Sequence, residues 1–215
     1  MLTNAYEGVK KIYKAEILAL IGEALALVGS ILSATGIQAG EGTASGDGLL
    51  IGGGLIVIIA AILLIVAAIL NIMGVNRAAK DETAFKNALI AVLAGIAANV
   101  VVSAFSGNEI ISSIGKTVFN FTELLASYFI CTGVINLSDR LSDSAVSASG
   151  RKVRSILLGI WAVAAVLSVL TVLFGTNETM QAIIGVAAIV SGIISIVAYF
   201  LYIGLLGKAK KMLAK

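Results

Sequence analysis

The sequence contains no proline and no histidine, only one cysteine and few charged residues. Without proline, no helix carries a proline kink, so we expect fairly straight helices whose breaks come from glycine clusters or polar insertions. The absence of histidine excludes imidazole acid–base catalysis and histidine-ligated metal sites. Cys131 has no second cysteine to pair with, so an intrachain disulfide is excluded and the redox compartment is not readable from it.

Charge is scarce and apolar residues dominate. Of the 215 residues, 13% are charged and 59% are hydrophobic, and the mean hydropathy is +1.06. A soluble domain has about a quarter of its residues charged. The composition therefore predicts an integral membrane protein of one-domain size, embedded in a lipid bilayer.

Long apolar segments recur along the chain, each near or above the roughly 20 residues that an α-helix needs to cross a bilayer. We predict an all-α polytopic membrane protein, with a six-helix transmembrane bundle forming a single domain over residues 15–215. The predicted helices are residues 15–36, 50–75, 86–105, 110–136, 154–174 and 180–206.

Residues 1–14 precede the first apolar segment and are predicted to form a short basic amphipathic helix at the membrane interface. A signal peptide is the alternative, but the apolar run that follows is longer than the usual 7–15 residues. The apolar face and its basic flank are Leu2, Tyr6, Val9, Tyr13, Lys10, Lys11 and Lys14.

Connections that contain basic residues alternate along the chain with connections that contain none. All but Lys116 of the 15 Lys and Arg residues lie at the termini or after the second and fourth apolar segments, and the other connections carry only acidic charges. The positive-inside rule then predicts that both termini are cytoplasmic. If residues 110–136 did not cross the membrane, the basic C-terminus would lie outside, so the charges support this segment as a span. We expect the cytoplasmic membrane of a bacterium or archaeon.

The segments also pair into three tandem helical hairpins. Each pair begins near basic residues and turns in an acidic loop, and the returning helices end in GVNRAAK, GVINLSDR and GLLGKAKK. Internal duplication and the shared demands of topology both explain this pattern, and repeats are common in transporters.

Small residues at helical spacing predict where helices pack closely in lipid. One predicted seam is Ala91, Gly95 and Ala98; a second is Ala188, Gly192 and Ser195. The glycines 52–54 are predicted to allow either a close helix crossing, which is favoured, or local unwinding.

Residues 110–136 form the only long apolar segment with a polar stripe along its whole length. Ser113, Lys116, Asn120, Glu123 and Ser127 follow at steps of three and four, within roughly 80° of arc on a helix. Charged side chains at membrane depth are rare and face a bundle interior or a watery cavity. Lys116 is close enough to the outer end to extend toward the interface. Glu123 lies near the midplane and has no such escape.

A matching stripe occurs on the first segment, where Glu23 lies roughly 10–12 Å inside the span at 1.5 Å per residue. If the two stripes face each other, Glu23 and Glu123 form a site for a cation or a proton. Glu16 is expected to be a solvated acid at the interface. The alternative to the cation or proton site is that Glu23 and Glu123 only hold helices together. Asn120, Ser127, Ser30 and Asn99 are the candidate neutral oxygen ligands for the cation site.

Enzymatic motifs are absent from the sequence. There is no H-E-x-x-H, nucleophile elbow or P-loop, and Ser45 has no histidine to activate it. Asp139 and Asp143 are four residues apart, but a solvated, serine-rich connection is favoured over a metal or partner site. We therefore expect no enzyme, no cofactor, no metal site and no nucleic-acid partner.

Two classes of function fit these features. The first is a small channel or transporter for a cation, a proton or a small solute. The second is a non-transport module, such as an immunity, scaffold or regulatory subunit; either class allows a homo-oligomer or a partner membrane subunit.

The chain also broadly resembles the substrate-binding membrane subunits of energy-coupling-factor vitamin transporters. Six helices in 22.0 kDa and the spacing A-x-x-x-A at Ala15 and Ala19 carry this resemblance, and no motif extends it over the chain. It implies a bound vitamin and an ATPase partner.

Overall fold

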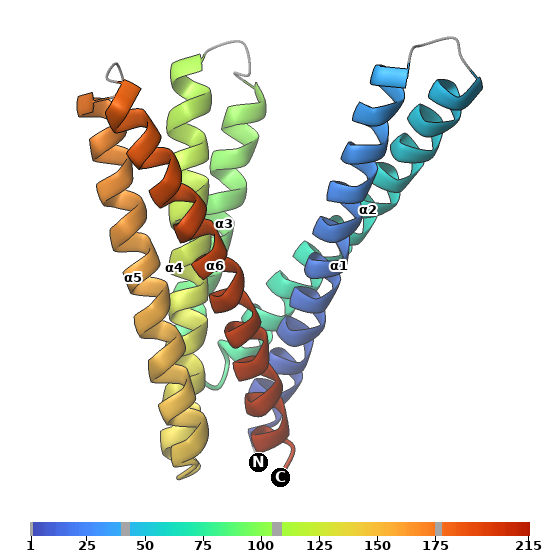
Figure 1. Ribbon diagram of the computed structural model, residues 1–215. Helices are drawn as coiled ribbons and strands as arrows, with labels where there is room; N and C mark the ends of the chain where they lie inside the picture. The colour runs from blue at the N-terminus through green and yellow to red at the C-terminus, as the bar shows by residue number, and fades with distance from the viewer. Residues whose placement is uncertain (1, 40–43, 105–108, 175–177) are drawn as a thin grey trace. The chain divides into compact units, whose positions relative to one another are not determined.

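The computed structural model describes residues 2–39, 44–104, 109–174 and 178–215. In these ranges the chain is all-helical, without strands, and each of its six helices is long and apolar enough to cross a membrane (Figure 1). This confirms the prediction of six long apolar helices. The helices are α1 (Thr3–Ala39), α2 (Ala44–Ala78), α3 (Thr83–Ala104), α4 (Glu109–Arg140), α5 (Ser144–Phe174) and α6 (Glu178–Leu213).

The helices extend beyond the apolar runs from which they were predicted. α1 begins at Thr3 and continues without interruption to Ala39, so the residues expected to form a separate interfacial helix are the first turns of a longer one. α4 and α6 likewise continue through polar ends to Arg140 and Leu213. Ala, Lys, Leu and Arg at these ends favour the helix, and no proline stops it.

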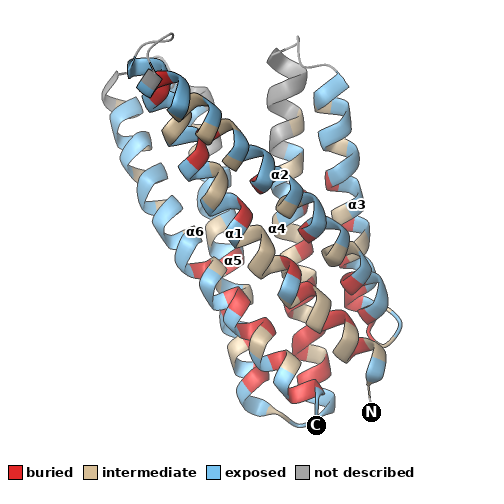
Figure 2. Ribbon diagram, turned by 90° about the vertical axis from the view of Figure 1, so that its right-hand side faces the viewer, coloured by how far each residue is buried: buried red, intermediate tan, exposed pale blue. Residues whose placement is uncertain are grey.

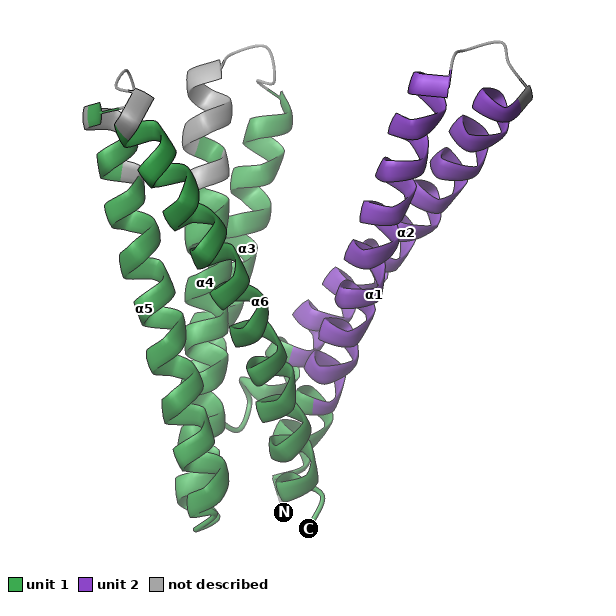
Figure 3. Ribbon diagram, viewed as in Figure 1, with its two compact units in different colours: residues 1–9, 75–215 green, residues 10–74 purple. Residues whose placement is uncertain are grey.

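The chain divides into two compact units (Figure 3). Unit 1 comprises residues 1–9 and 75–215, and unit 2 comprises residues 10–74. Unit 2 therefore contains most of α1 and α2, and unit 1 contains α3 to α6 together with the first turns of α1.

Unit 2 is a hairpin whose two helices meet along small residues. A side-chain Cβ built on Gly53 would lie 2.7 Å from the carbonyl oxygen of Gly29, and one built on Gly36 would lie 2.9 Å from that of Gly46. Only glycine allows backbones to approach this closely. The buried small residues recur every seventh position, as Gly22, Gly29 and Gly36 on α1 and as Gly46, Gly53, Ala60 and Ala67 on α2.

A seven-residue repeat keeps one seam of each helix facing its partner. The seam shows which of the glycines 52–54 contacts α1. A Cβ built on Gly52 or Gly54 would meet nothing within 4 Å. Only Gly53 faces α1, and residues 52–54 remain helical. The favoured prediction of a helix crossing is therefore confirmed for Gly53, and the unwinding is not observed.

Unit 1 has its core at one end. We call this end, where α3 and α5 begin and α4 and α6 end, the base. Buried side chains gather toward it (Figure 2). The large, fully buried side chains include Phe85, Ile130, Leu137, Tyr202, Leu205 and Leu206. Away from the base, large apolar side chains are exposed, as lipid-facing surface would be; examples are Val100, Val101, Val166, Val169, Ile189 and Ile193.

Consecutive helices of unit 1 are in contact, and α4 also touches α6. The seam predicted on α3 is present: Ala91 and Gly95 are buried, and a Cβ on Gly95 would lie 2.6 Å from Oγ1 of Thr122 on α4. Gly133 of α4 lies in the same way under the ring of Phe85. The division into three separate hairpins stays a prediction.

The seam predicted on α6 does not pack against α5. Ala188 and Gly192 are exposed, and a Cβ on Gly192 would meet nothing within 4 Å. Ser195 is half-buried and donates to the carbonyl oxygen of Ser191 at 2.9 Å. α6 is instead buried at the base, through residues such as Tyr202 and Leu206. Small residues permit close packing but do not require it.

Candidate functional site

The polar stripe of α4 lies on an outer face of unit 1. Asn120 and Glu123 are exposed, and Ser127 is half-buried. Thr122, beside Glu123, is buried against Gly95 of α3, so the polar stripe points away from that seam. Ser113 and Lys116 belong to the same helix, but their side chains lie outside the described residues.

Glu23 and Ser30 belong to unit 2. Glu23 is exposed on α1, beside the close contact of Gly22 with Leu64. The Ser30 hydroxyl is exposed and donates to the carbonyl oxygen of Ala26 at 2.8 Å. Because Glu23 belongs to unit 2 and Glu123 to unit 1, the meeting of the two acids stays a prediction.

Two further polar residues have contacts that the sequence did not indicate. Glu16, expected as a solvated acid, is half-buried, and its Oε1 accepts a hydrogen bond from Nδ2 of Asn71 at 3.3 Å. This bond joins α1 to α2 within unit 2. Asn99 is exposed on α3, and its backbone carbonyl accepts the Ser103 hydroxyl at 2.9 Å, so its amide remains only a candidate ligand.

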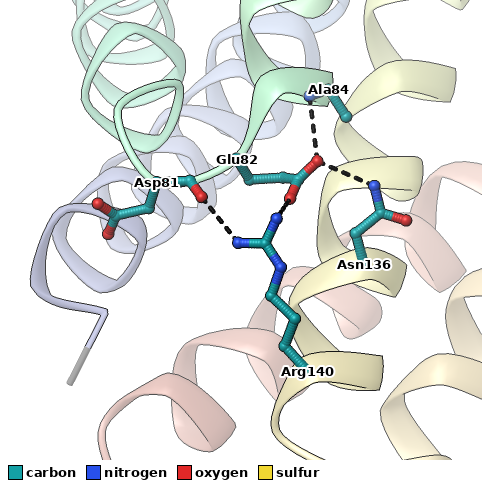
Figure 4. Close-up of polar contacts among 5 residues, drawn as sticks. All are labelled: Asp81, Glu82, Ala84, Asn136 and Arg140. Atoms are coloured by element: carbon teal, nitrogen blue, oxygen red, sulfur yellow. Dashed lines mark hydrogen bonds and ion pairs between the residues drawn. The ribbon is translucent and has the colours of Figure 1, made fainter.

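The most buried of the described acids of unit 1 is one that the sequence did not single out. Glu82 lies in the turn between α2 and α3 (Figure 4). Its side chain is only 2% exposed. Its Oε2 pairs with Nη2 of Arg140 at 2.6 Å, and its Oε1 accepts from Nδ2 of Asn136 at 2.9 Å and from the backbone N–H of Ala84 at 3.3 Å. The carboxylate thus caps the start of α3 and joins it to the end of α4.

The neighbouring residue extends this network to α1. Asp81 Oδ2 accepts the backbone N–H of Ala5 at 2.7 Å, and its Oδ1 accepts from Nδ2 of Asn4 at 3.1 Å. A carboxylate at a helix N-terminus satisfies an unpaired N–H and complements the helix dipole. The carbonyl oxygen of Asp81 also accepts from Nη1 of Arg140 at 3.0 Å (Figure 4).

One short turn therefore holds the ends of α1, α3 and α4 together at the base. We call Asp81, Glu82, Asn136 and Arg140 the base cluster. Every one of these four residues is engaged in contacts between helices, which makes the cluster a structural element of unit 1. The sequence shows an acidic pair, Asp81 and Glu82, ahead of the helix predicted from residue 86, but this pattern does not distinguish the buried acid from its neighbour.

The two carboxylates Asp139 and Asp143 make separate contacts. Asp139 pairs with Arg151 at 3.3 Å on the surface. Asp143 Oδ1 accepts the backbone N–H of Val146 at 3.1 Å and so caps the start of α5. Among the residues that the structure describes, no group of three or more His, Cys, Asp or Glu side chains is placed to hold a metal ion.

Comparison with known proteins gives no match, whether to a family model, to a curated protein or to a solved structure. The function is therefore argued from the residues of this chain. They offer two polar sites: the base cluster, and an outer face of α4 on which Asn120 and Glu123 are exposed.

Proposed function

We propose that the chain is a small multipass membrane channel or carrier for a cation, a proton or a small solute, with its pathway along the polar face of α4. The observation that carries this proposal is the exposed Glu123 near the middle of α4, next to the exposed Asn120.

The physical argument is the cost of a charged group in hydrocarbon. In translocon-insertion measurements, a charged residue at the centre of a membrane helix costs about 3 kcal/mol. Many other exposed side chains of the same unit are large and apolar, such as Val100 and Val166. Charged side chains at membrane depth usually face a bundle interior or a watery cavity, and a water-filled pathway along this face of α4 would solvate the Glu123 carboxylate.

The charge distribution supports an orientation for this pathway. The base carries basic residues on exposed positions, among them Arg151, Lys152 and Lys208, so we place it in the cytoplasm by the positive-inside rule. α4 then runs from the outer to the inner surface, and Glu123 lies between the two.

Glu23 of α1 is the proposed counterpart of Glu123, with Ser127, Ser30 and Asn99 as neutral oxygen ligands. An arrangement of carboxylate, amide and hydroxyl oxygens suits a hard cation, and a pair of carboxylates also suits a shared proton. Both acids are exposed on the surfaces of their units, which is the condition for them to line a common pathway.

The pathway predicts a loss of transport when the central charge is removed. In proteoliposomes loaded with a pH-sensitive or cation-sensitive dye, Glu123→Gln should reduce flux by about tenfold or more, because the loss of a charge-assisted ligand of 1.5–3 kcal/mol corresponds to about that factor. The matched control is Asp139→Asn, which removes the same charge from the same helix at the base. Equal flux for the wild type and a folded Glu123→Gln would refute transport and favour the non-transport module.

The proposed pairing predicts a cross-link. In a Cys131→Ser background, which removes the only native cysteine, Glu23→Cys and Glu123→Cys combined should form an intrachain disulfide under mild oxidation, because two side chains sharing one ion lie within bridging range. The control pair combines Glu123→Cys with Ile21→Cys, exposed two residues earlier on α1. Equal yields for the two pairs would contradict the pairing without excluding a pathway along α4.

A further inference from the structure

An apolar groove runs between α4 and α5 on unit 1. It has a volume of about 140 Å³ and is lined by Phe121, Leu124, Leu125, Tyr128, Leu157, Leu158 and Trp161. The lining is aliphatic and aromatic apart from the hydroxyl of Tyr128 and the indole N–H of Trp161. Contact between apolar surfaces is favoured over contact of either surface with water. The groove therefore suits several methylene groups better than water.

Aromatic side chains give the groove fixed walls. Phe121 of α4 and Trp161 of α5 pack with ring centroids 5.6 Å apart and planes tilted by 52°. Both side chains are nevertheless 43% exposed, so this pair borders the groove and remains accessible from outside the unit. Such rings present a large apolar surface while losing little rotamer freedom on contact.

A positive charge stands at the end of the groove nearer the base. The Arg154 guanidinium lies 5.6 Å from the ring centroid of Tyr128, and its Nη1 donates to Oγ1 of Thr132 at 3.4 Å. Arg154 precedes the groove residues Leu157 and Leu158 by one helical turn. The cation–π contact and the hydrogen bond hold the guanidinium at the groove end.

Among the residues that the structure describes, no carboxylate lies within ion-pair distance of Arg154. A guanidinium has five N–H donors in a planar fork, which matches the geometry of a phosphate group. Lys152, two residues before Arg154 on α5, is exposed, and Arg151 pairs with Asp139 instead.

From this combination we propose that the α4–α5 groove binds an anionic phospholipid. One acyl chain lies along the apolar groove, and the headgroup phosphate accepts hydrogen bonds from Arg154. A basic pocket between membrane helices at the cytoplasmic side is the setting in which anionic lipid headgroups bind. The site is separate from the proposed transport pathway, because it is formed by the aromatic face of α4 with α5.

The single tryptophan of the chain provides a direct test. The full-length protein is reconstituted in phosphatidylcholine vesicles that contain the same minor fraction of brominated phosphatidylglycerol or of brominated phosphatidylcholine, and quenching of Trp161 fluorescence is measured. Bromine quenches tryptophan only at short range. We expect brominated phosphatidylglycerol to bind about fivefold more tightly than brominated phosphatidylcholine and therefore to quench Trp161 more strongly. This factor corresponds to the attraction between one basic residue and an anionic membrane lipid.

Two variants with the same change of charge separate the site from general surface charge. Arg154→Gln should abolish the preference for phosphatidylglycerol over phosphatidylcholine. Lys152→Gln changes an exposed residue two positions earlier and should keep this preference. An equal loss in both variants would show attraction to surface charge only. Equal quenching of the wild type by both lipids refutes the site whether or not a variant folds. The absence of any quenching would show that protein, such as a second copy, covers the groove.

Discussion

Replacing Gly53 by alanine is expected to destabilise the α1–α2 hairpin by about 2 kcal/mol, in the range for overpacking a close contact. The new methyl group would lie 2.7 Å from the carbonyl oxygen of Gly29 and would also meet the Ser33 hydroxyl. Backbone atoms of a helix have no room to shift, so the helices must separate. The thermal unfolding midpoint in detergent micelles measures this effect.

The adjacent glycines provide controls, because alanine is not expected to destabilise the hairpin at these positions. A Cβ at Gly52 or Gly54 meets nothing within 4 Å, and alanine is favoured over glycine inside a helix by about 1 kcal/mol. Gly52→Ala and Gly54→Ala should therefore unfold at the same temperature as the wild type or at a higher one. A Gly53→Ala protein as stable as these two would exclude the seam.

Replacing Arg140 by alanine is the second change for which a large effect is expected, about 3 kcal/mol of lost stability. Glu82 is 2% exposed and would keep its bonds from Asn136 and Ala84 but lose its ion pair. Removing one partner of a buried pair leaves a buried charge uncompensated, which costs about 3–5 kcal/mol. Arg140 itself is 54% exposed, so water offsets part of this cost, and we expect the lower end of the range.

A surface ion pair between α4 and α5 provides the comparison. Arg151→Ala breaks an ion pair with Asp139 in which the two side chains are 63% and 49% exposed, and exposed pairs contribute at most about 1 kcal/mol. Adding Glu82→Gln to Arg140→Ala removes the buried charge and should restore part of the lost stability. If Arg140→Ala and Arg151→Ala unfold at the same denaturant concentration, the base cluster does not stabilise unit 1.

The helices themselves were predictable because the signal for them is local. Apolar runs of membrane length, uninterrupted by proline, specify helices wherever they occur. Their ends were less predictable: α1 includes residues 3–14, and α6 continues to Leu213, because polar residues such as lysine favour a helix without adding to the apolar run.

The polar contacts were not predictable to the same degree. Glu123 stood out because an acid within an apolar run is conspicuous in any sequence. Glu82 did not, since it lies in a polar connection, and its partners Asn136 and Arg140 are 54 and 58 residues away. The sequence contains no local sign of which acid in a polar turn becomes buried.

The contacts of the small residues were also not predictable from the sequence alone. Residues 52–54 are identical in the sequence, yet only Gly53 meets α1. On α6, the spacing of Ala188 and Gly192 resembles that of the α3 seam, yet both residues are exposed.

The sequence by itself thus determined the all-helical class and the six long apolar helices, because hydropathy and length are properties of each segment alone. Only the tertiary structure decided which glycine is a contact, which acid is buried and which arginine stands at the end of an apolar groove. These depend on the rotation of each helix about its axis and on atoms brought together from distant parts of the chain.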